Sequence, residues 1–437
     1  MKKAAFTTLG CKVNFYETEA LKALLEKEGY ILTDFSDTAD IYVINTCTVT
    51  HLSDRKSRQL VRRAKRRAPQ SLVVVTGCYA QVSPEDLSSL PEVDIMIGTS
   101  QRHQLPRLIE QAKMEGKINV VHPVEGATEF ERLTYRANRS RTRAFLKVQE
   151  GCTQHCNYCI VPQARGPDRS SPLPDVLAEV EQIAAEGYRE IVLTGIRLGL
   201  YRDDKAGVDL SGLVREIEKY PAIERIRLSS IEPTDFNEDL IQVMADSSKI
   251  CHHLHIPLQS GSDYILEKMN RPYRKKHYLE LVNKLSEKMP ELALGSDIMV
   301  GFPGETYEHH RQSYEFIQRI AFSRLHVFRY SPRPHTPASE MKGHVDPRIK
   351  EERWQEINEL GKNLAHYYRQ KFMGRKVKIL AERASDEDDY LEGFTEHYLR
   401  VRAETKDKPS QWLGQLVWVE VKNAVEETLQ GIFLSHA

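Results

Sequence analysis

Three cysteines lie close together in the middle of the chain, in the segment EGCTQHCNYCIVP. Cys152, Cys156 and Cys159 form a C-x3-C-x2-C array just after a predicted strand. One short loop can bring three thiolates onto three irons of a [4Fe–4S] cluster, which leaves the fourth iron without a protein ligand. That open iron can bind the amino and carboxylate groups of S-adenosylmethionine (SAM), and electron transfer into the sulfonium then releases a 5′-deoxyadenosyl radical.

A structural zinc site is the main alternative for these cysteines. Structural zinc takes four ligands in a closed tetrahedron, and His155 is an awkward fourth ligand because it lies inside the first gap of the array. The spacing therefore favours an iron–sulfur cluster and makes the three cysteines the candidate catalytic residues.

Further segments of the central region could contact a nucleoside cofactor. They are LTGIRLG, RLSSIEP, HIPLQSGS and SDIMVGFPGET, and each is predicted at the carboxyl end of a strand, where an open barrel binds its ligands. Taken alone, each segment could equally be a turn or a helix cap. The candidate residues are Gly195, Ser229, Glu232, Gln259 and Asp297.

Three more cysteines are far apart in sequence but share one context. Cys11, Cys47 and Cys78 each directly follow a predicted strand, in FTTLGC, VINTC and VVTGC. Neighbouring parallel strands would place the three thiols along one edge of a sheet, where open α/β sheets gather their ligands. A lone cysteine is usually a buried structural residue, which is how we interpret Cys251. Three such coincidences instead predict a second metal cluster.

The elements that position these cysteines form three predicted domains of an α/β protein. Residues 1–130 alternate apolar runs with helical patterns, which predicts a parallel α/β domain. Residues 138–371 contain six candidate strands, too few for a closed eight-stranded barrel but enough for an open (β/α)6 partial barrel. Residues 374–437 contain short strands without helices, which predicts a small all-β barrel. Residues 129–143 are expected to be a linker.

Composition excludes several classes of protein. No stretch of the 437 residues approaches the roughly 18 apolar residues of a membrane span, and the N-terminus does not form a secretory signal. We therefore expect a cytoplasmic protein. Seven cysteines are too few for a disulfide-stapled secreted domain and favour metal or redox chemistry.

Lys and Arg total 62, as do Asp and Glu, so net charge alone does not indicate an anionic partner. The distribution of charge does, because two stretches are strongly basic. Each could be a solvated face, but two of them near a proposed active site favour a polyanion. The first stretch is residues 55–67, and the second contains Arg132, Arg136, Arg139, Arg141 and Arg143.

The central array, with Tyr158 before its last cysteine, resembles the radical SAM superfamily, in which this aromatic residue lies against the adenine of the cofactor. Two cysteine triads, a partial barrel and a small β-barrel together resemble the methylthiotransferases over essentially the whole chain, with a C-terminal TRAM domain. The segments RAFLKVQEGCTQHCNYCIVPQARGPDRSSP and GFTEHYLRV are most similar to the branch that methylthiolates N6-threonylcarbamoyladenosine at position 37 of tRNA. The sequence differs from the pattern of that branch at positions such as Gln154-His155 and Gln163-Ala164, and these differences leave the cysteines intact.

This resemblance implies two [4Fe–4S] clusters and SAM as cofactors. One SAM molecule would methylate sulfur at the auxiliary cluster on Cys11, Cys47 and Cys78. A second would be cleaved at the cluster on Cys152, Cys156 and Cys159, and the radical would remove hydrogen from C2 of the adenine. An unactivated C–H has no acidic proton, so we expect no general acid or base. The implied partners are the tRNA anticodon stem-loop and a reducing electron donor.

Two other readings stay open at this point. One is the same chemistry on isopentenyladenosine-37 or on an aspartate of a ribosomal protein. The other is a non-catalytic cluster-bearing protein that binds RNA. For RNA docking, the small barrel offers arginines and rings that could neutralise phosphates and stack on bases, although core packing would explain many of the rings. These residues are Arg400, Arg402, Phe394, Tyr398, Trp412 and Trp418.

Overall fold

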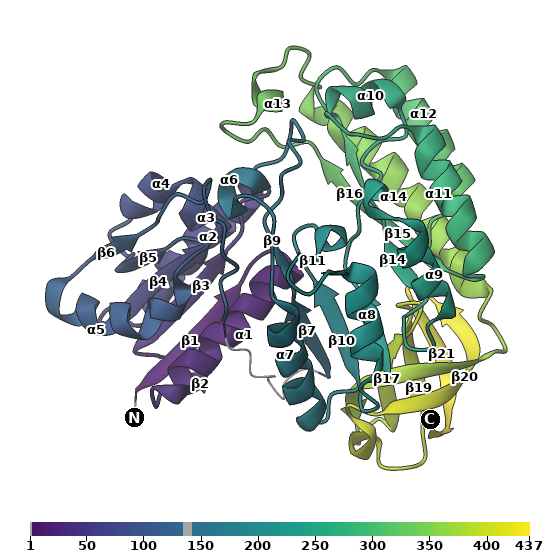
Figure 1. Cartoon of the computed structure of the whole chain (residues 1–437), viewed down its shortest axis with the longest axis horizontal. Helices are drawn as coiled ribbons and strands as arrows, with labels where there is room; N and C mark the ends of the chain where they lie inside the picture. Colours follow the sequence, from purple (N-terminus) through teal and green to yellow (C-terminus); the bar gives the residue numbers. More distant parts are fainter. Residues whose placement is uncertain (1, 134–141) are drawn as a thin grey trace.

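The computed structural model describes residues 2–133 and 142–437. Its N-terminal part is a six-stranded parallel sheet in the order β2-β1-β3-β4-β5-β6, with helices on its faces (Figure 1). The strands are β1 (Lys3–Thr8), β2 (Ile31–Thr33), β3 (Ile41–Thr46), β4 (Leu72–Gly77), β5 (Ile95–Ile97) and β6 (Ile118–Val120). The helices are α1 (Lys12–Lys27), α2 (His51–Arg67), α3 (Cys78–Val82), α4 (Pro84–Ser88) and α5 (Leu105–Glu115).

The sequence of β3, IYVINT, explains its central place in this sheet. All six residues are buried, as expected for a parallel strand that is covered on both faces. β3 pairs with β1 on one side and with β4 on the other. Because the three strands are parallel neighbours, the loops that follow them meet at one edge of the sheet. This confirms the predicted parallel α/β fold of the region.

The central region contains six parallel strands, divided into two three-stranded sheets of order β13-β10-β7 and β14-β15-β16. An isolated parallel bridge between Ile226 and Ile250 joins them, and the barrel stays open. This confirms the predicted open partial barrel. The strands are β7 (Arg143–Lys147), β10 (Glu190–Thr194), β13 (Arg225–Leu228), β14 (His253–His255), β15 (Ala293–Val300) and β16 (Arg324–Arg329). The main helices are α6 (Val161–Arg165), α7 (Leu173–Ala185), α8 (Leu210–Glu218), α9 (Glu238–Asp246), α10 (Asp263–Lys268), α11 (Lys275–Lys288), α12 (Tyr307–Ile320) and α13 (Pro337–Glu340). Short two-residue strands complete the region: β8 (Gln149–Glu150), β9 (Arg169–Ser170), β11 (Arg202–Asp203) and β12 (Val208–Asp209).

The long helix α14 (Pro347–Gln370) leads from the partial barrel to a closed five-stranded barrel at the C-terminal end (Figure 1). The order of the strands around this barrel is β17-β18-β19-β21-β20, which confirms the predicted small β-barrel. Its strands are β17 (Lys376–Ser385), β18 (Tyr390–Thr395), β19 (Arg400–Glu404), β20 (Leu416–Val425) and β21 (Thr428–His436). No helix in the described part of the chain is long and apolar enough to cross a membrane.

Two arginines of β13 bind the small barrel. Arg225 donates to the carbonyl oxygens of Lys378 and Phe394 at 2.6 and 3.1 Å. Arg227 donates to the carbonyl oxygens of Thr395 and Glu396 at 3.1 and 3.0 Å. Five-donor guanidinium groups suit this role, since each can satisfy two carbonyl groups at once.

Two arginines of the second basic stretch lie in the described part of the chain, and both pair with carboxylates of the protein. Arg132 pairs with Asp175 at 2.8 Å, and Arg143 pairs with Glu382 at 2.6 Å. Arg143 also begins β7, so the expectation that residues 129–143 are all linker is wrong at its last residue. Arg136, Arg139 and Arg141 lie outside the described residues. The two described ends of this stretch therefore hold the fold together.

A half-buried carboxyl group at the contact between the first two domains is expected to make stability dependent on pH. Glu179 on α7 accepts a hydrogen bond from Tyr16 Oη on α1 at 3.0 Å. Burial raises the pKa of Glu179 from 4.5 to about 7, although the bond from Tyr16 opposes the rise. The unfolded chain loses this proton near pH 4.5 and the folded chain only near pH 7, so the stability that protonated Glu179 provides is lost as pH rises through that range.

We therefore expect Glu179→Gln to stabilise the protein at pH 8 by about 1–3 kcal/mol and to change little at pH 4. Glutamine keeps an acceptor for Tyr16 and cannot ionise. Thermal melts of both proteins at the two pH values measure the difference. Glu181→Gln, an exposed position on the same helix, is the control and should show no such dependence. An equal gain at both pH values would argue against the role of the Glu179 carboxyl.

Candidate active site

Cys152, Cys156 and Cys159, the central triad, lie on the loop between β8 and α6, at the carboxyl end of the partial barrel. The backbone closes the loop: Cys152 N donates to Gly166 O and Cys159 N to Cys156 O, both at 3.0 Å. Burial raises the pKa of the Cys159 thiol to about 12, and the neighbouring Cys156 and Cys152 add to the rise. The structure thus brings the three predicted thiols together.

Gly151 is the residue that allows this loop to lie so close to the next segment. Its φ is +76°, and a Cβ atom there would lie 1.9 Å from the carbonyl oxygen of Pro167. Any side chain would therefore push the start of the triad away from the segment that Cys152 bonds to.

Arg271 connects the central triad to Glu232, one of the predicted cofactor residues. Its Nη1 donates to the Sγ atom of Cys156 at 3.2 Å, and its Nη2 donates to Glu232. Burial raises the pKa of Glu232, although Arg271 opposes the rise. Tyr158 lies close enough to Arg271 and Glu232 for their charges to interact, and its ring packs edge-on against Phe302. Two of the predicted cofactor residues therefore lie beside the central triad.

The other predicted cofactor residues have different surroundings. Gly195 directly follows β10, and a Cβ atom there would lie 2.9 Å from the side chain of Gln149. Ser229 directly follows β13, and its Oγ is buried without a hydrogen-bond partner in the described structure. Gln259 has a positive φ of 65° and bridges to Ile298. The expectation that all of these residues lie at strand ends is wrong for Asp297.

Asp297 lies in the middle of β15, because that strand continues to Val300. It pairs with His255 of β14, with 3.2 Å between the carboxylate oxygen and Nε2. Its side chain is 29% exposed, so it lies in a space that solvent reaches.

Cys11, Cys47 and Cys78, the N-terminal triad, follow β1, β3 and β4 as predicted. Gly10 lies so close to Cys47 that a Cβ atom at Gly10 would be 3.2 Å from the Cys47 Sγ atom. Burial raises the pKa of the Cys78 thiol to about 12, while Arg165 opposes the rise and Cys47 and Cys11 add to it. These three thiols, distant in sequence, are thus near neighbours at one sheet edge.

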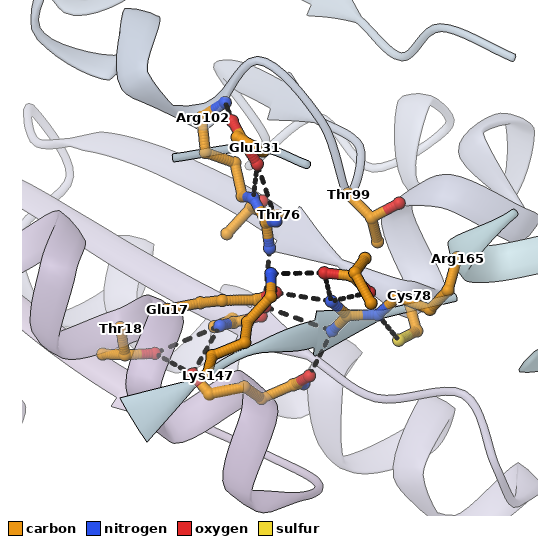
Figure 2. A network of polar contacts seen from close by, with 12 residues as sticks. Glu17, Thr18, Thr76, Cys78, Thr99, Arg102, Glu131, Lys147 and Arg165 are labelled. Carbon is orange, nitrogen blue, oxygen red and sulfur yellow. Dashed lines mark hydrogen bonds and ion pairs between the residues drawn. The ribbon is translucent and has the colours of Figure 1, made fainter. Parts of the chain in front are cut away.

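A buried arginine from the central region reaches the N-terminal triad (Figure 2). Arg165, at the end of α6, is 0% exposed and donates from Nε to the Cys78 Sγ atom at 3.2 Å. Its Nη1 and Nη2 atoms donate to Glu17 at 2.5 and 3.1 Å, and Nη2 donates to Asn14 at 2.5 Å. Asn14 in turn donates to the carbonyl oxygens of Leu9 and Thr46, beside the other two cysteines. One side chain therefore links the loop of the central triad to all three strand ends of the N-terminal triad.

Glu17 is the anionic centre of this network (Figure 2). Its carboxylate pairs with Arg165 and Arg102, both at 2.5 Å, and with Lys147 at 3.1 Å. Burial alone would raise the pKa of Glu17, but these cations hold it well below its ordinary value. Glu150 adds a second buried carboxylate, which pairs with Arg165 and Lys147. The site is held by paired charges that come from both domains.

The donors present in both triads fit [4Fe–4S] clusters. Each triad supplies three thiols, and each has a buried guanidinium that donates to one sulfur, Arg165 to Cys78 and Arg271 to Cys156. Hydrogen bonds to the sulfurs and nearby positive charge are typical of iron–sulfur sites, whose thiolates are negatively charged. Among the described residues, no three His, Cys, Asp or Glu side chains converge on a single ion. Each thiolate of a cubane binds a different iron, so three thiols that hold one do not need to converge on a single ion.

Sequence reasoning did not identify Arg165, Arg271 or Glu17. Arg165 and Glu17 are 148 positions apart, and Arg271 and Cys156 are 115 apart, so no local pattern connects them. The one available signal was the position of Arg165 in the segment IVPQARG, six residues after Cys159.

Two three-stranded parallel sheets around an open centre, with a C-x3-C-x2-C loop at their carboxyl end, define a radical SAM enzyme. A model of the Radical SAM superfamily matches residues 146–317, and a model described as "Uncharacterized protein family UPF0004" matches residues 3–98. Among solved structures, the radical SAM methyltransferase TsrM of Kitasatospora setae is similar with a TM-score of 0.58 and 18% identity, over 78% of this chain and 77% of that one. This likeness supports the fold.

Full-length relatives identify the family. The chain is 42% identical to threonylcarbamoyladenosine tRNA methylthiotransferase MtaB of Bacillus subtilis, over 99% of this chain and 97% of the relative. It is 40% identical to the protein of the same name from Aquifex aeolicus, over 92% and 97%. It is 34% identical to tRNA-2-methylthio-N(6)-dimethylallyladenosine synthase of Aquifex aeolicus, over 99% of each. The chain therefore belongs to the radical SAM methylthiotransferase family, in the MtaB-like branch.

Proposed function

We propose that this enzyme methylthiolates C2 of N6-threonylcarbamoyladenosine at position 37 of tRNA. The observation that carries the proposal is the second cysteine triad, which Arg165 ties to the loop of the first. A radical site alone can remove hydrogen, whereas insertion of sulfur also requires a second site that supplies it. The relatives with 42% and 40% identity are named as threonylcarbamoyladenosine tRNA methylthiotransferases.

The cofactors of the family are SAM and [4Fe–4S] clusters, and the two triads are their proposed positions. When bound, they supply a 5′-deoxyadenosyl radical and the sulfur that is transferred. Cys152, Cys156 and Cys159 would hold the cluster that cleaves SAM. Cys11, Cys47 and Cys78 would hold the auxiliary cluster.

Other residues of the chain would position these groups. The half-buried ring of Tyr158 would lie against the cofactor adenine, and Glu232, held by Arg271, would orient polar atoms of the nucleoside. Gly195, Ser229, Gln259 and Asp297 are the further proposed cofactor contacts. We assign no general acid or base, because the C–H bond that breaks has no acidic proton.

A second candidate substrate is N6-dimethylallyladenosine, since a relative that is 34% identical over the whole chain carries that name. The higher identity to the threonylcarbamoyladenosine proteins makes this reading less favoured. Mass spectrometry of tRNA nucleosides from cells with and without the gene separates the two. We expect the methylthio form of threonylcarbamoyladenosine to disappear; loss of a different methylthiolated nucleoside would overturn the substrate assignment.

We propose that helix α2 binds the anticodon stem-loop of the substrate tRNA in the cytoplasm. Arg62, Arg63 and Arg66 are exposed on this helix, whereas Arg58 and Lys65 bond to neighbouring groups of the domain. α2 follows Cys47 closely, which would place phosphates near the auxiliary site. A reducing electron donor is also required, because cleavage of SAM consumes an electron.

Charge reversal of Arg62, Arg63 and Arg66 should weaken tRNA binding and flatten its dependence on salt. Each lost phosphate contact is expected to reduce the slope of log K against log salt by about 1. Filter binding at several salt concentrations measures this slope. Reversal of Lys276, Lys284 and Lys288 on α11 changes net charge equally and should leave the slope unchanged. Equal slopes for wild type and the α2 variant would remove this helix from the RNA site.

A further inference from the structure

A cavity of about 360 Å³ lies where the small barrel meets the partial barrel. Its walls come from the start of β16, the second half of α14 and the turn between β18 and β19. Arg324 and His326 line it from β16, and both are exposed. Alternate residues of a strand point to the same face. Leu325 faces Gly361 of α14, so Arg324 and His326 lie on the opposite face of β16.

The lining of this cavity carries more positive than negative charge. Arg324, Lys362 and Arg369 line it, and no ion pair among the described residues includes any of the three. Arg400 also lines it and is paired with Glu392. The only carboxylate in the lining is that of Glu427, which is exposed.

Several buried nitrogens of the lining have no hydrogen-bond partner in the described structure. Arg369 is 9% exposed and its Nε has no hydrogen bond in the described structure. His397 is 9% exposed with neither ring nitrogen bonded, and His253 is 5% exposed with Nδ1 unbonded. Buried polar groups without a partner carry a free-energy penalty, which a bound acceptor removes.

The turn between β18 and β19 places the ring of Tyr398 against three arginines and does not neutralise their charge. The Tyr398 ring lies beneath Arg227, Arg143 and Arg324, at 4.5, 5.2 and 5.9 Å from the ring centroid. Arg227 and Arg143 already have carboxylate partners, Glu190 and Glu382. Of these three arginines, Arg324 is therefore the one that has no carboxylate partner in the described structure and can pair with an anionic ligand.

The cationic cavity adjoins one of the proposed cofactor contacts. Asp297 pairs with His255 at 3.2 Å, and the ring of His255 lies 5.6 Å from the ring of His326, which lines the cavity. A substrate base held near Asp297 could therefore extend a substituent toward Arg324.

We propose that this cavity binds the carboxylate of the threonylcarbamoyl group, with Arg324 as its principal partner. The inference rests on the proposed function and assigns its substrate specificity to residues of this cavity. The threonine part of this nucleoside ends in a carboxylate, whereas the dimethylallyl group of the alternative substrate is apolar. A cation that gains a carboxylate partner selects the first, and leaving that cation desolvated and unpaired disfavours the second.

Binding of two anticodon stem-loop RNAs of one sequence tests this inference. One carries threonylcarbamoyladenosine at position 37 and the other an unmodified adenosine. Wild type should prefer the modified RNA by about 10-fold or more, as expected for a charged hydrogen bond. Arg324→Gln should lose this preference and bind the unmodified RNA as wild type does, and Arg324→Lys should recover part of it. A third RNA, with the carboxylate converted to its methyl ester, should bind wild type no better than unmodified RNA.

Other outcomes are equally decisive. Equal weakening of both RNAs by Arg324→Gln would mean that the cavity binds a backbone phosphate and would overturn the inference. Unchanged preference in that variant would also overturn it. Iron content and thermal melting of Arg324→Gln verify that the variant folds, as its exposure predicts. Failure of the proposed function is seen separately, because wild type would then form no methylthio product on the modified RNA.

Discussion

Cys152→Ala should abolish both SAM cleavage and methylthiolation, whereas Cys47→Ala should abolish only methylthiolation. The two positions belong to different triads on different domains, so each substitution would remove a ligand from one of the two proposed clusters. Iron content should fall from about 8 to about 4 per chain in each variant. The Cys47 variant should still form 5′-deoxyadenosine under reducing conditions, because the central triad and its contact with Arg271 are intact. Anaerobic iron analysis, nucleoside mass spectrometry and 5′-deoxyadenosine assays measure the three quantities.

Cys251 provides the matched control for these substitutions. It is buried, 1% exposed, and belongs to neither triad. Cys251→Ala should therefore keep all of the iron and both activities. If Cys47→Ala instead retains methylthiolation, the N-terminal triad is not the source of the inserted sulfur. If it loses SAM cleavage together with methylthiolation, the two sites do not function separately.

The cysteine positions could be predicted because each depends on local sequence. A buried run such as IYVINT predicts a parallel strand, and parallel neighbours bring the residues after them to one edge. Cys47 and Cys78 therefore needed no knowledge of the tertiary fold. The same reasoning was wrong for Asp297, since an apolar stretch does not mark where β15 ends.

The interior charges could not be predicted in this way. Whether Glu17 is a solvated helix residue or the centre of a buried network depends on Arg102, Lys147 and Arg165, none of which is near it in sequence. The rings of the small barrel show the same limit. The sequence left open whether Phe394 and Tyr398 stack on RNA bases or pack inside the protein, and in the structure both lie against the guanidinium of Arg143.

Arg165→Gln should destabilise the protein by about 3–5 kcal/mol and lose the iron of the N-terminal triad. Removal of one partner from a buried ionic network leaves charge uncompensated, and here Glu17 and Glu150 both lose a cation. The Cys78 sulfur also loses its donor, which lies 3.2 Å away in the wild type. Urea unfolding followed by circular dichroism measures the apparent stability, and iron analysis of the reconstituted protein measures the cluster.

Arg102→Gln separates the effect of Arg165 on the stability of the fold from the effect of its hydrogen bond to Cys78. Arg102 pairs with the same Glu17 carboxylate and is equally buried, but its ion-pair partners in the described structure are Glu17 and Glu131, and neither is a cysteine. It should therefore lose comparable stability yet keep about 8 irons per chain. Arg165→Lys should recover part of the stability, because it restores one positive charge, but a single ammonium cannot replace bonds to Cys78, Asn14 and Glu17 together. Loss of iron in Arg102→Gln to the same extent would show that the network acts on the triad only through the stability of the fold, and that the contact between Arg165 and Cys78 has no separate effect.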